Sequence, residues 1–279
     1  MLINRGIVLI SVHGLSVGYG KRTILHDVDF SAESSQIIAL IGPNGCGKST
    51  MLRTLSGQIK PQKGSVSICG QELSSLRQKE LSKCVAFLPQ RHEAVHGVSV
   101  HELVAMGRAP YHRSGWILSM KDKEKIKWAL SYMNLEDYVS RPVDQLSGGE
   151  QQRVWIAMAL AQDTPIILLD EPVTYMDLRF QWELLSTIGD LRDTHGKTIV
   201  SVFHDINHAI EVADHIYLFK DGRVYAQGTS EEVVTEDNIG DVYGLYAYVC
   251  RFNRCRRNVV VPTSLNPRFK RRHGNRVVM

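Results

Sequence analysis

The stretch Gly42-Pro43-Asn44-Gly45-Cys46-Gly47-Lys48-Ser49 decides the fold of this chain, because it matches G-x-x-x-x-G-K-[ST] at every fixed position. It lies between the apolar run 36–41, predicted to be a buried strand, and a helix predicted to begin at Lys48. Glycines in such a loop let the backbone turn its N–H groups toward phosphate oxygens, and the following helix adds its positive end. The stretch therefore predicts a binding site for a nucleoside triphosphate.

Individual side chains of this loop have predicted partners. Lys48 is expected to reach the β- and γ-phosphates, and the Ser49 hydroxyl is expected to ligate Mg²⁺. The Cys46 thiol has two interpretations: a reactive group whose modification blocks nucleotide binding, or a small buried residue. The predicted nucleotide-binding residues of the loop and its helix are Gly42, Pro43, Asn44, Gly45, Cys46, Gly47, Lys48, Ser49 and Thr50.

An acidic pair follows a second apolar run. Asp170 ends the run 166–169, and ligands of open α/β sheets collect at the carboxyl ends of the strands, so Asp170 is predicted to bind Mg²⁺. Glu171 stands one residue farther out, where a carboxylate can act as general base on an attacking water. Taken alone, the pair could also be solvated acids at the start of a loop.

The segments around the pair predict the fold class. The apolar runs 165–170 and 198–203 flank a segment, 178–192, with helical spacing. This strand, helix, strand order is a βαβ crossover, and continuous apolar runs are typical of parallel strands covered on both faces. The sequence therefore predicts an α/β protein, with a layer of amphipathic helices inserted at about 100–138.

The segment Leu146-Ser147-Gly148-Gly149-Glu150-Gln151 has two compatible interpretations. Ser147 and Glu150 have the S-x-x-E spacing of a capping box in front of a helix at 151–161. A glycine-flanked helix N-terminus is also an anion site, here for the γ-phosphate of a nucleotide held by another subunit.

With these motifs in place, the sequence resembles the ATP-binding cassette (ABC) proteins of ABC transporters over about residues 7–250. The motifs stand in the family's order: the loop 42–49, Gln90 after 85–89, the segment 146–151, Asp170-Glu171-Pro172, Asp177 and His204. The resemblance implies a P-loop NTPase cassette with a mixed sheet core, an N-terminal antiparallel β subdomain and an inserted helical subdomain at about 91–160. It departs from the usual pattern at Val173 and Met176, where small changes in rate and no loss of hydrolysis are expected.

The resemblance also implies a head-to-tail homodimer. Two ATP molecules would lie between the loop 42–49 of one copy and Ser147, Gly148 and Gly149 of the other. The roles that it implies for the remaining site residues are adenine stacking for Tyr19, the dimer-contacting D-loop for Asp177, contact with the γ-phosphate for His204, and for Gln90 a link between Mg²⁺, water and the membrane subunits. On their own, these residues could be an edge-strand aromatic, a helix cap, the end of a strand and a polar loop residue.

The tracts 102–111, 154–162 and 204–209 resemble the ATPases of ferric-siderophore, haem and cobalamin importers. The implied function is to energise an importer by ATP hydrolysis, for a ferric siderophore or other iron chelate first, with haem, cobalamin or another metal chelate as alternatives. Integral-membrane permease subunits and an extracytoplasmic binding protein would recognise the solute. The cassette would then work as a peripheral protein at the cytoplasmic face of the inner membrane.

Charge separates the chain into two parts. Of 33 basic residues, nine lie in 251–279, which contains no acid, so the remainder carries 24 basic and 29 acidic residues. We therefore expect a cassette at 1–250 and a basic tail at 251–279. The tail could be a solubilising segment or could contact anionic lipid headgroups. An acidic body is not an obvious binder of nucleic acid.

Other classes of protein fit less well. No apolar run approaches the ~20 residues that span a bilayer, and the first ten residues have no plausible signal-peptide cleavage site. The five cysteines form no paired C-x-x-C pattern, and the odd count suits a reducing cytosol. A soluble cassette acting on nucleic acid or ribosomes usually has a second cassette or a coiled-coil insertion, and a GTPase has N-K-x-D; the sequence shows none of these.

Overall fold

The structure, a computed structural model, describes residues 6–90, 95–112, 117–174, 176–251 and 257–266. The basic residues Arg254, Arg256, Arg268, Lys270, Arg271, Arg272 and Arg276 lie outside these ranges. Within them, no helix has both the length and the apolar character that crossing a membrane requires.

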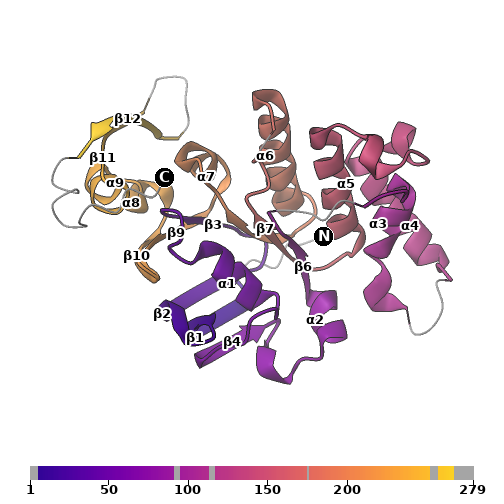
Figure 1. The fold of residues 1–279 in the computed structure, drawn as a ribbon, viewed down its shortest axis with the longest axis horizontal. Helices are drawn as coiled ribbons and strands as arrows, with labels where there is room; N and C mark the ends of the chain where they lie inside the picture. Colours follow the sequence, from indigo (N-terminus) through magenta and orange to yellow (C-terminus); the bar gives the residue numbers. More distant parts are fainter. Residues whose placement is uncertain (1–5, 91–94, 113–116, 175, 252–256, 267–279) are drawn as a thin grey trace.

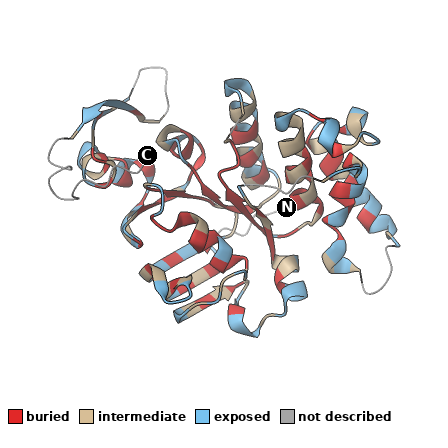
Figure 2. Cartoon of the chain, in the orientation of Figure 1, coloured by how far each residue is buried: buried red, intermediate tan, exposed pale blue. Residues whose placement is uncertain are grey.

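A six-stranded mixed sheet forms the centre of the molecule (Figure 1), in the order β10-β9-β3-β8-β7-β6. All neighbours are parallel except β9 and β10, which form a hairpin. Every residue of β3, β7 and β8 is buried (Figure 2), which explains their continuous apolar sequences. The strand bounds are Ile37–Ile41 (β3), Val85–Leu88 (β6), Ile166–Asp170 (β7), Thr198–Val202 (β8), His215–Lys220 (β9) and Arg223–Gly228 (β10).

A second, antiparallel sheet packs below the first, in the order β2-β1-β4-β5. Its strands are Val8–Tyr19 (β1), Arg22–Glu33 (β2), Lys63–Ile68 (β4) and Gln71–Glu72 (β5). Helix α1, Lys48–Leu55, lies between the two sheets and contributes Met51, Leu52 and Leu55 to their shared apolar core. This core fixes the position of the loop 42–47 that precedes α1. The mixed sheet, the N-terminal antiparallel sheet and the helical layer confirm the predicted fold class.

The inserted layer contains α3 (Val100–Met106), α4 (Met120–Tyr132) and α5 (Gly148–Ala161). The buried guanidinium of Arg108 holds them together: Nε donates to Asp122 at 2.8 Å, and Nη1 donates to the carbonyl of Ala161 at 2.8 Å. Burial raises the pKa of Asp122, but hydrogen bonds from Ser119 and Arg108 outweigh it and hold the pKa at about 2. The layer is therefore one packed unit with a charged centre.

The segment that follows β5 does not form one continuous helix. The segment forms a 3₁₀ turn at Leu73–Ser75 and then α2 at Gln78–Cys84, because Leu76 and Arg77 between them are extended. The remaining 3₁₀ turns are Ala109–Tyr111, Glu136–Tyr138 and Val143–Gln145.

The C-terminal part packs against the edge of the central sheet. After α6 (Leu178–Asp193) and α7 (Ile206–Val212) come α8 (Ser230–Val233), α9 (Glu236–Tyr243) and a two-stranded ribbon of β11 (Leu245–Cys250) and β12 (Val259–Leu265). The ribbon is bonded to α7, the helix that starts two residues after His204: Asn207 and Val260 exchange two hydrogen bonds. Arg257 donates to the carbonyls of Ile210 and Ala213 at 2.6 and 3.0 Å. Thus Arg257 and β12 belong to the folded body, although their sequence lies in the basic segment.

Candidate active site

The loop before α1 has a conformation that glycine makes possible. Gly42, Gly45 and Gly47 have φ values of 143°, 79° and 108°. A Cβ atom on Gly47 would lie 2.3 Å from Leu25 Cδ2, and one on Gly42 would lie 2.3 Å from the carbonyl oxygen of Phe219. Gly47 caps α1 without a side-chain hydrogen bond, and the first turn holds no acid. The N–H groups of this turn therefore lack a side-chain acceptor and can bind an anion.

Lys48 is the basic group of this loop, and it is only 5 % exposed. Its Nζ donates to the carbonyl oxygens of Gly42 at 2.7 Å and Pro43 at 3.0 Å, and it lies 3.7 Å from Cys46 Sγ. A buried ammonium group with no ion-pair partner among the described residues fits a site that receives a phosphate.

Ser49 and Asp170 meet across the two elements that carry them. The Ser49 hydroxyl at the start of α1 donates to Asp170 Oδ1 at the end of β7, at 2.9 Å. Burial raises the pKa of Asp170, against the hydrogen bond from Ser49, which lowers it. A hydroxyl and a buried carboxylate without an ion-pair partner in the described residues are oxygen ligands of the kind that Mg²⁺ prefers. The donor set fits the predicted metal.

Glu171 collects two further predicted residues. Its Oε2 accepts a hydrogen bond from Gln90 Nε2, and its Oε1 lies 2.6 Å from His204 Nε2. Thr174, which the sequence analysis missed, donates to Oε2 at 3.5 Å. Glu171 has φ 56°, a left-handed conformation that costs energy for a residue with a side chain. The structure thus brings Gln90, Asp170, Glu171 and His204 to one edge of the sheet, beside the loop 42–47.

The segment 147–149 forms a separate part of the site. Ser147 caps α5: its backbone N–H and its hydroxyl donate to Glu150 Oε2 at 2.8 and 2.7 Å. These bonds lower the pKa of Glu150. A Cβ on Gly148 would meet nothing within 4 Å, so no close contact within the described chain requires glycine there. No hydrogen bond among the described residues joins this segment to the loop 42–47.

The two remaining predicted site residues, Tyr19 and Asp177, lie on separate elements. Tyr19, at the end of β1, is 49 % exposed, and its hydroxyl accepts a hydrogen bond from Arg53 of α1 at 3.2 Å. Asp177 caps α6, since its carboxylate accepts from the N–H of Phe180 at 3.0 Å. The structural interpretation of Asp177 is therefore correct, whether or not it also contacts a second copy.

Sequence reasoning missed Tyr243, which comes from α9 at the far end of the fold. Burial raises the pKa of Tyr243, with Cys46 as a neighbour, and a hydrogen bond from the backbone N–H of Gly42 acts in the other direction. A residue two hundred positions from the loop gives no local signal of this contact.

The sequence of this chain is similar to those of known ATP-binding proteins. A family model described as ABC transporter matches residues 25–174. The chain is 42% identical over 257 residues to the iron(3+)-hydroxamate import ATP-binding protein FhuC of Bacillus subtilis (strain 168), covering 92% of this chain and 95% of that protein.

Two solved structures have the same fold. One is a chain of an ABC transporter described as of metal-chelate type, in an inward-facing conformation, with a TM-score of 0.81 at 27% identity, covering 92% of this chain and 98% of the other. The second is an ATP-binding cassette in a dimeric post-hydrolysis state bound to ADP and phosphate, with a TM-score of 0.70 at 29% identity, covering 79% of this chain and 98% of the other.

Proposed function

Because this chain belongs to the ABC transporter family of ATP-binding proteins, we propose that it hydrolyses ATP to drive the import of a ferric siderophore or another iron chelate. The observation that carries the catalytic part is the convergence of Gln90, Glu171 and His204 beside the Ser49–Asp170 pair. Binding, metal ligation and base catalysis would then share one edge of the sheet.

Nucleotide binding would use the open N-terminus of α1. The N–H groups of the loop 42–47 and of Ser49 and Thr50 would surround the phosphates, and Lys48 would exchange its carbonyl partners for phosphate oxygens. Tyr19, half exposed beside α1, would stack on the adenine. Ser49, Asp170 and Gln90 would hold Mg²⁺, which neutralises charge on the β- and γ-phosphates.

Hydrolysis would use Glu171 as the general base. Its carboxylate would accept a proton from a water whose oxygen attacks the γ-phosphorus, while the bond from phosphorus to the leaving ADP oxygen breaks. In the structure the same carboxylate contacts Gln90 and His204. These two side chains would turn to the water and to the γ-phosphate when substrate is present, which leaves Glu171 free to accept the proton.

A second copy would complete the site. Gly148 has open space where a Cβ would stand, and Ser147 lies on the surface of α5 with no bond to the loop of its own chain. Both features fit a head-to-tail homodimer in which Ser147, Gly148 and Gly149 approach the γ-phosphate on the partner, with Asp177 nearby. The similar cassette bound to ADP and phosphate is dimeric.

The transported solute is proposed from the relatives. FhuC is an iron(3+)-hydroxamate import protein, and the similar full transporter is of metal-chelate type. Haem, cobalamin and other metal chelates are the alternatives, and a cassette acting on nucleic acid is a distant one. We propose that permease subunits bind near Gln90 and the helical layer at the cytoplasmic face of the membrane, and that an extracytoplasmic binding protein delivers the solute.

The substitution Glu171→Gln tests the catalytic assignment. It removes the proton acceptor but keeps the size of the side chain, so ATP should still bind while turnover falls by roughly 10²–10⁴-fold and a dimer accumulates. Glu124→Gln, at an exposed carboxylate of α4, is the matched control. Unchanged hydrolysis in Glu171→Gln would contradict the assignment.

Growth on single iron sources tests the solute. Cells that lack the protein should fail to grow when a ferric hydroxamate or another ferric siderophore is the sole iron source. A defect confined to haem or cobalamin use would favour the corresponding alternative, and co-purification with RNA instead of membrane subunits would overturn the importer proposal.

A further inference from the structure

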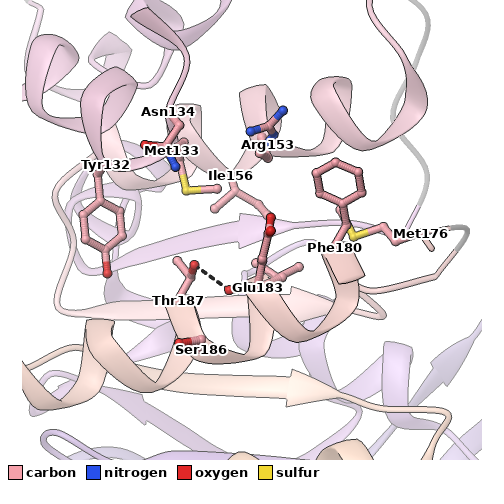
Figure 3. A pocket seen from close by; sticks show the side chains of 11 residues that line it. Tyr132, Met133, Asn134, Arg153, Ile156, Met176, Phe180, Glu183, Ser186 and Thr187 are labelled. Atoms are coloured by element: carbon pink, nitrogen blue, oxygen red, sulfur yellow. Dashed lines mark hydrogen bonds between the residues drawn. The ribbon is translucent and has the colours of Figure 1, made fainter. Parts of the chain in front are cut away.

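A cavity of about 280 Å³ lies between the helical layer and α6 (Figure 3). One wall comes from the end of α4 and from α5, and the opposite wall comes from α6 and Met176. Its apolar surface includes Met133, Ile156, Phe180 and Leu184. The volume is slightly below the ~300 Å³ at which pockets for drug-sized ligands begin, so any occupant is small.

Arg153 of α5 is the cationic group of this cavity. Its Nε is buried without a hydrogen-bond partner. In the described part of the chain the guanidinium makes no hydrogen bond or ion pair, and its Cζ lies 5.5 Å from the centroid of the Phe180 ring. A buried N–H that lacks an acceptor is rare in folded proteins and calls for a partner.

Three other polar side chains that line the cavity, Glu183, Thr187 and Tyr132, already have hydrogen-bond partners. Glu183 accepts from Arg179 Nε at 2.8 Å, and the Thr187 hydroxyl donates to the Glu183 carbonyl at 2.9 Å, as Figure 3 shows. Tyr132 donates to Asp190. Glu150, the carboxylate that Arg153 influences from the same helix, accepts from Ser147. Arg153 Nε therefore still lacks a hydrogen-bond acceptor.

We propose that this cavity binds a small amphipathic monoanion, with its carboxylate or sulfonate on Arg153 and a flat apolar body against Phe180, Ile156 and Leu184. A planar anion matches the fork of guanidinium donors and can accept two parallel hydrogen bonds. On binding, the apolar body is removed from water and packs against the apolar side chains of the cavity wall, which favours binding.

The position of the cavity gives the occupant a consequence for ATP turnover. Arg153 lies on the helix that begins at Ser147, and Met176 directly precedes Asp177. A ligand between these walls holds α5 at a fixed distance from α6. Occupancy is therefore expected to change the rate of ATP hydrolysis without displacing the nucleotide, and this holds whichever solute the transporter carries.

The test compares two aromatic probes of nearly equal shape on the full chain, 2-naphthoate and the neutral 2-naphthamide. Isothermal titration should give an affinity about tenfold or more higher for the carboxylate, because a charge-assisted bidentate pair is lost in the amide. Arg153→Gln should remove this preference, and Arg22→Gln, at an exposed arginine of β2 that does not line the cavity, should keep it.

A second variant guards against a failure of Arg153→Gln to fold. Ser186 is exposed and lines the cavity, so Ser186→Trp should block both probes while circular dichroism stays unchanged. Equal affinity for the two probes, full affinity in Arg153→Gln, or competition between 2-naphthoate and Mg-ATP would overturn the proposal. The last outcome would place the probe in the nucleotide site.

Discussion

Two helices of this protein have glycines at their N-termini, and they begin in opposite ways. Helix α1 starts at Gly47, with no side-chain cap and no acid in its first turn. Helix α5 starts at Ser147, with a complete capping box closed by Glu150. Both helices are expected to face a phosphate. Glycine near a helix N-terminus therefore does not by itself determine how that terminus binds an anion.

The difference lies in what satisfies the first N–H groups. In α5 the chain supplies its own acceptors, and the box stabilises the helix by about 0.5–2 kcal/mol. In α1 the N–H groups have no side-chain acceptor and Lys48 bonds only to loop carbonyls and the Cys46 sulfur, so a bound phosphate adds the missing partners. We therefore expect the N-terminus of α1 to bind phosphate tightly, and the N-terminus of α5 to add only contacts from the Ser147 hydroxyl and glycine N–H groups.

Removing the Lys48 charge at the N-terminus of α1 should have the largest effect of the changes considered, a loss of ATP affinity. Lys48→Ala should weaken ATP binding by about 100-fold, since charge-assisted hydrogen bonds contribute roughly 1.5–3 kcal/mol each. Fluorescence titration with a labelled ATP analogue measures this. Lys60→Ala, at an exposed lysine beyond the end of α1, should bind normally; normal binding in Lys48→Ala would show that the two termini do not differ as described.

Removing the Ser147 cap of α5 should have a smaller effect, on ATP turnover. Ser147→Ala and Ser99→Ala delete the same hydroxyl from the same capping box, the latter in α3. Each should lower the free energy of unfolding by about 1 kcal/mol. Only Ser147→Ala should also lower ATP turnover, by roughly tenfold for one lost phosphate contact.

Denaturant unfolding and a phosphate-release assay on both variants make this comparison. Equal turnover in Ser147→Ala and Ser99→Ala would mean that the α5 terminus has a structural role only.

Acidification should affect the two sites in ways that differ from ordinary carboxylates. The pKa of Asp170 is raised, so Asp170 takes up a proton at a higher pH than an ordinary aspartate does, and Mg²⁺-dependent ATP affinity should fall at a correspondingly higher pH. Protonation there favours the folded state, because the folded-state pKa exceeds the unfolded value. The pKa of Glu150 is lowered, so the stability that its ionised form adds persists until a lower pH.

Titrating nucleotide affinity and unfolding free energy over the acid range separates the two groups. Loss of Mg²⁺-dependent affinity only at the pH of an ordinary aspartate, or loss of the Glu150 contribution already at the pH of an ordinary glutamate, would contradict the respective assignment.

Alkylation of Cys46 should show the smallest effect, which is a change in the rate at which this one thiol reacts. Burial raises the pKa of Cys46, so its reaction with a bulky maleimide should be slow, and Mg-ATP in the loop should slow it several-fold further. Cys69 and Cys84, outside the loop, serve as internal controls in the same mass spectra. Equal rates at Cys46 with and without Mg-ATP would place the thiol outside the site.

Local sequence predicted the parts of this structure that depend on neighbouring residues. The buried strands followed from continuous apolar runs, and the α5 cap followed from the spacing of Ser147 and Glu150. Each of these signals is contained within about ten residues of chain.

Contacts between distant residues could not be predicted in the same way. The left-handed backbone of Glu171, the approach of Tyr243 to Gly42 and the burial of Arg108 each depend on packing between separate elements. The site roles of Gln90 and His204 came from a family resemblance, because one glutamine or histidine carries no local signal. The unpartnered Arg153 could not be recognised from the sequence, because its place after the segment 146–151 predicts only that it lies on the surface of α5.

The bonding of β12 to α7 limits how this chain can be altered at its end. Asn207 and Arg257 bond the ribbon to α7, the helix that follows His204, so the ribbon supports the segment that carries the proposed γ-phosphate contact. A fluorescent or affinity tag is best joined beyond residue 266. A cut before Val259 would break these bonds, and we expect it to change ATP turnover although it lies far from His204 in the sequence.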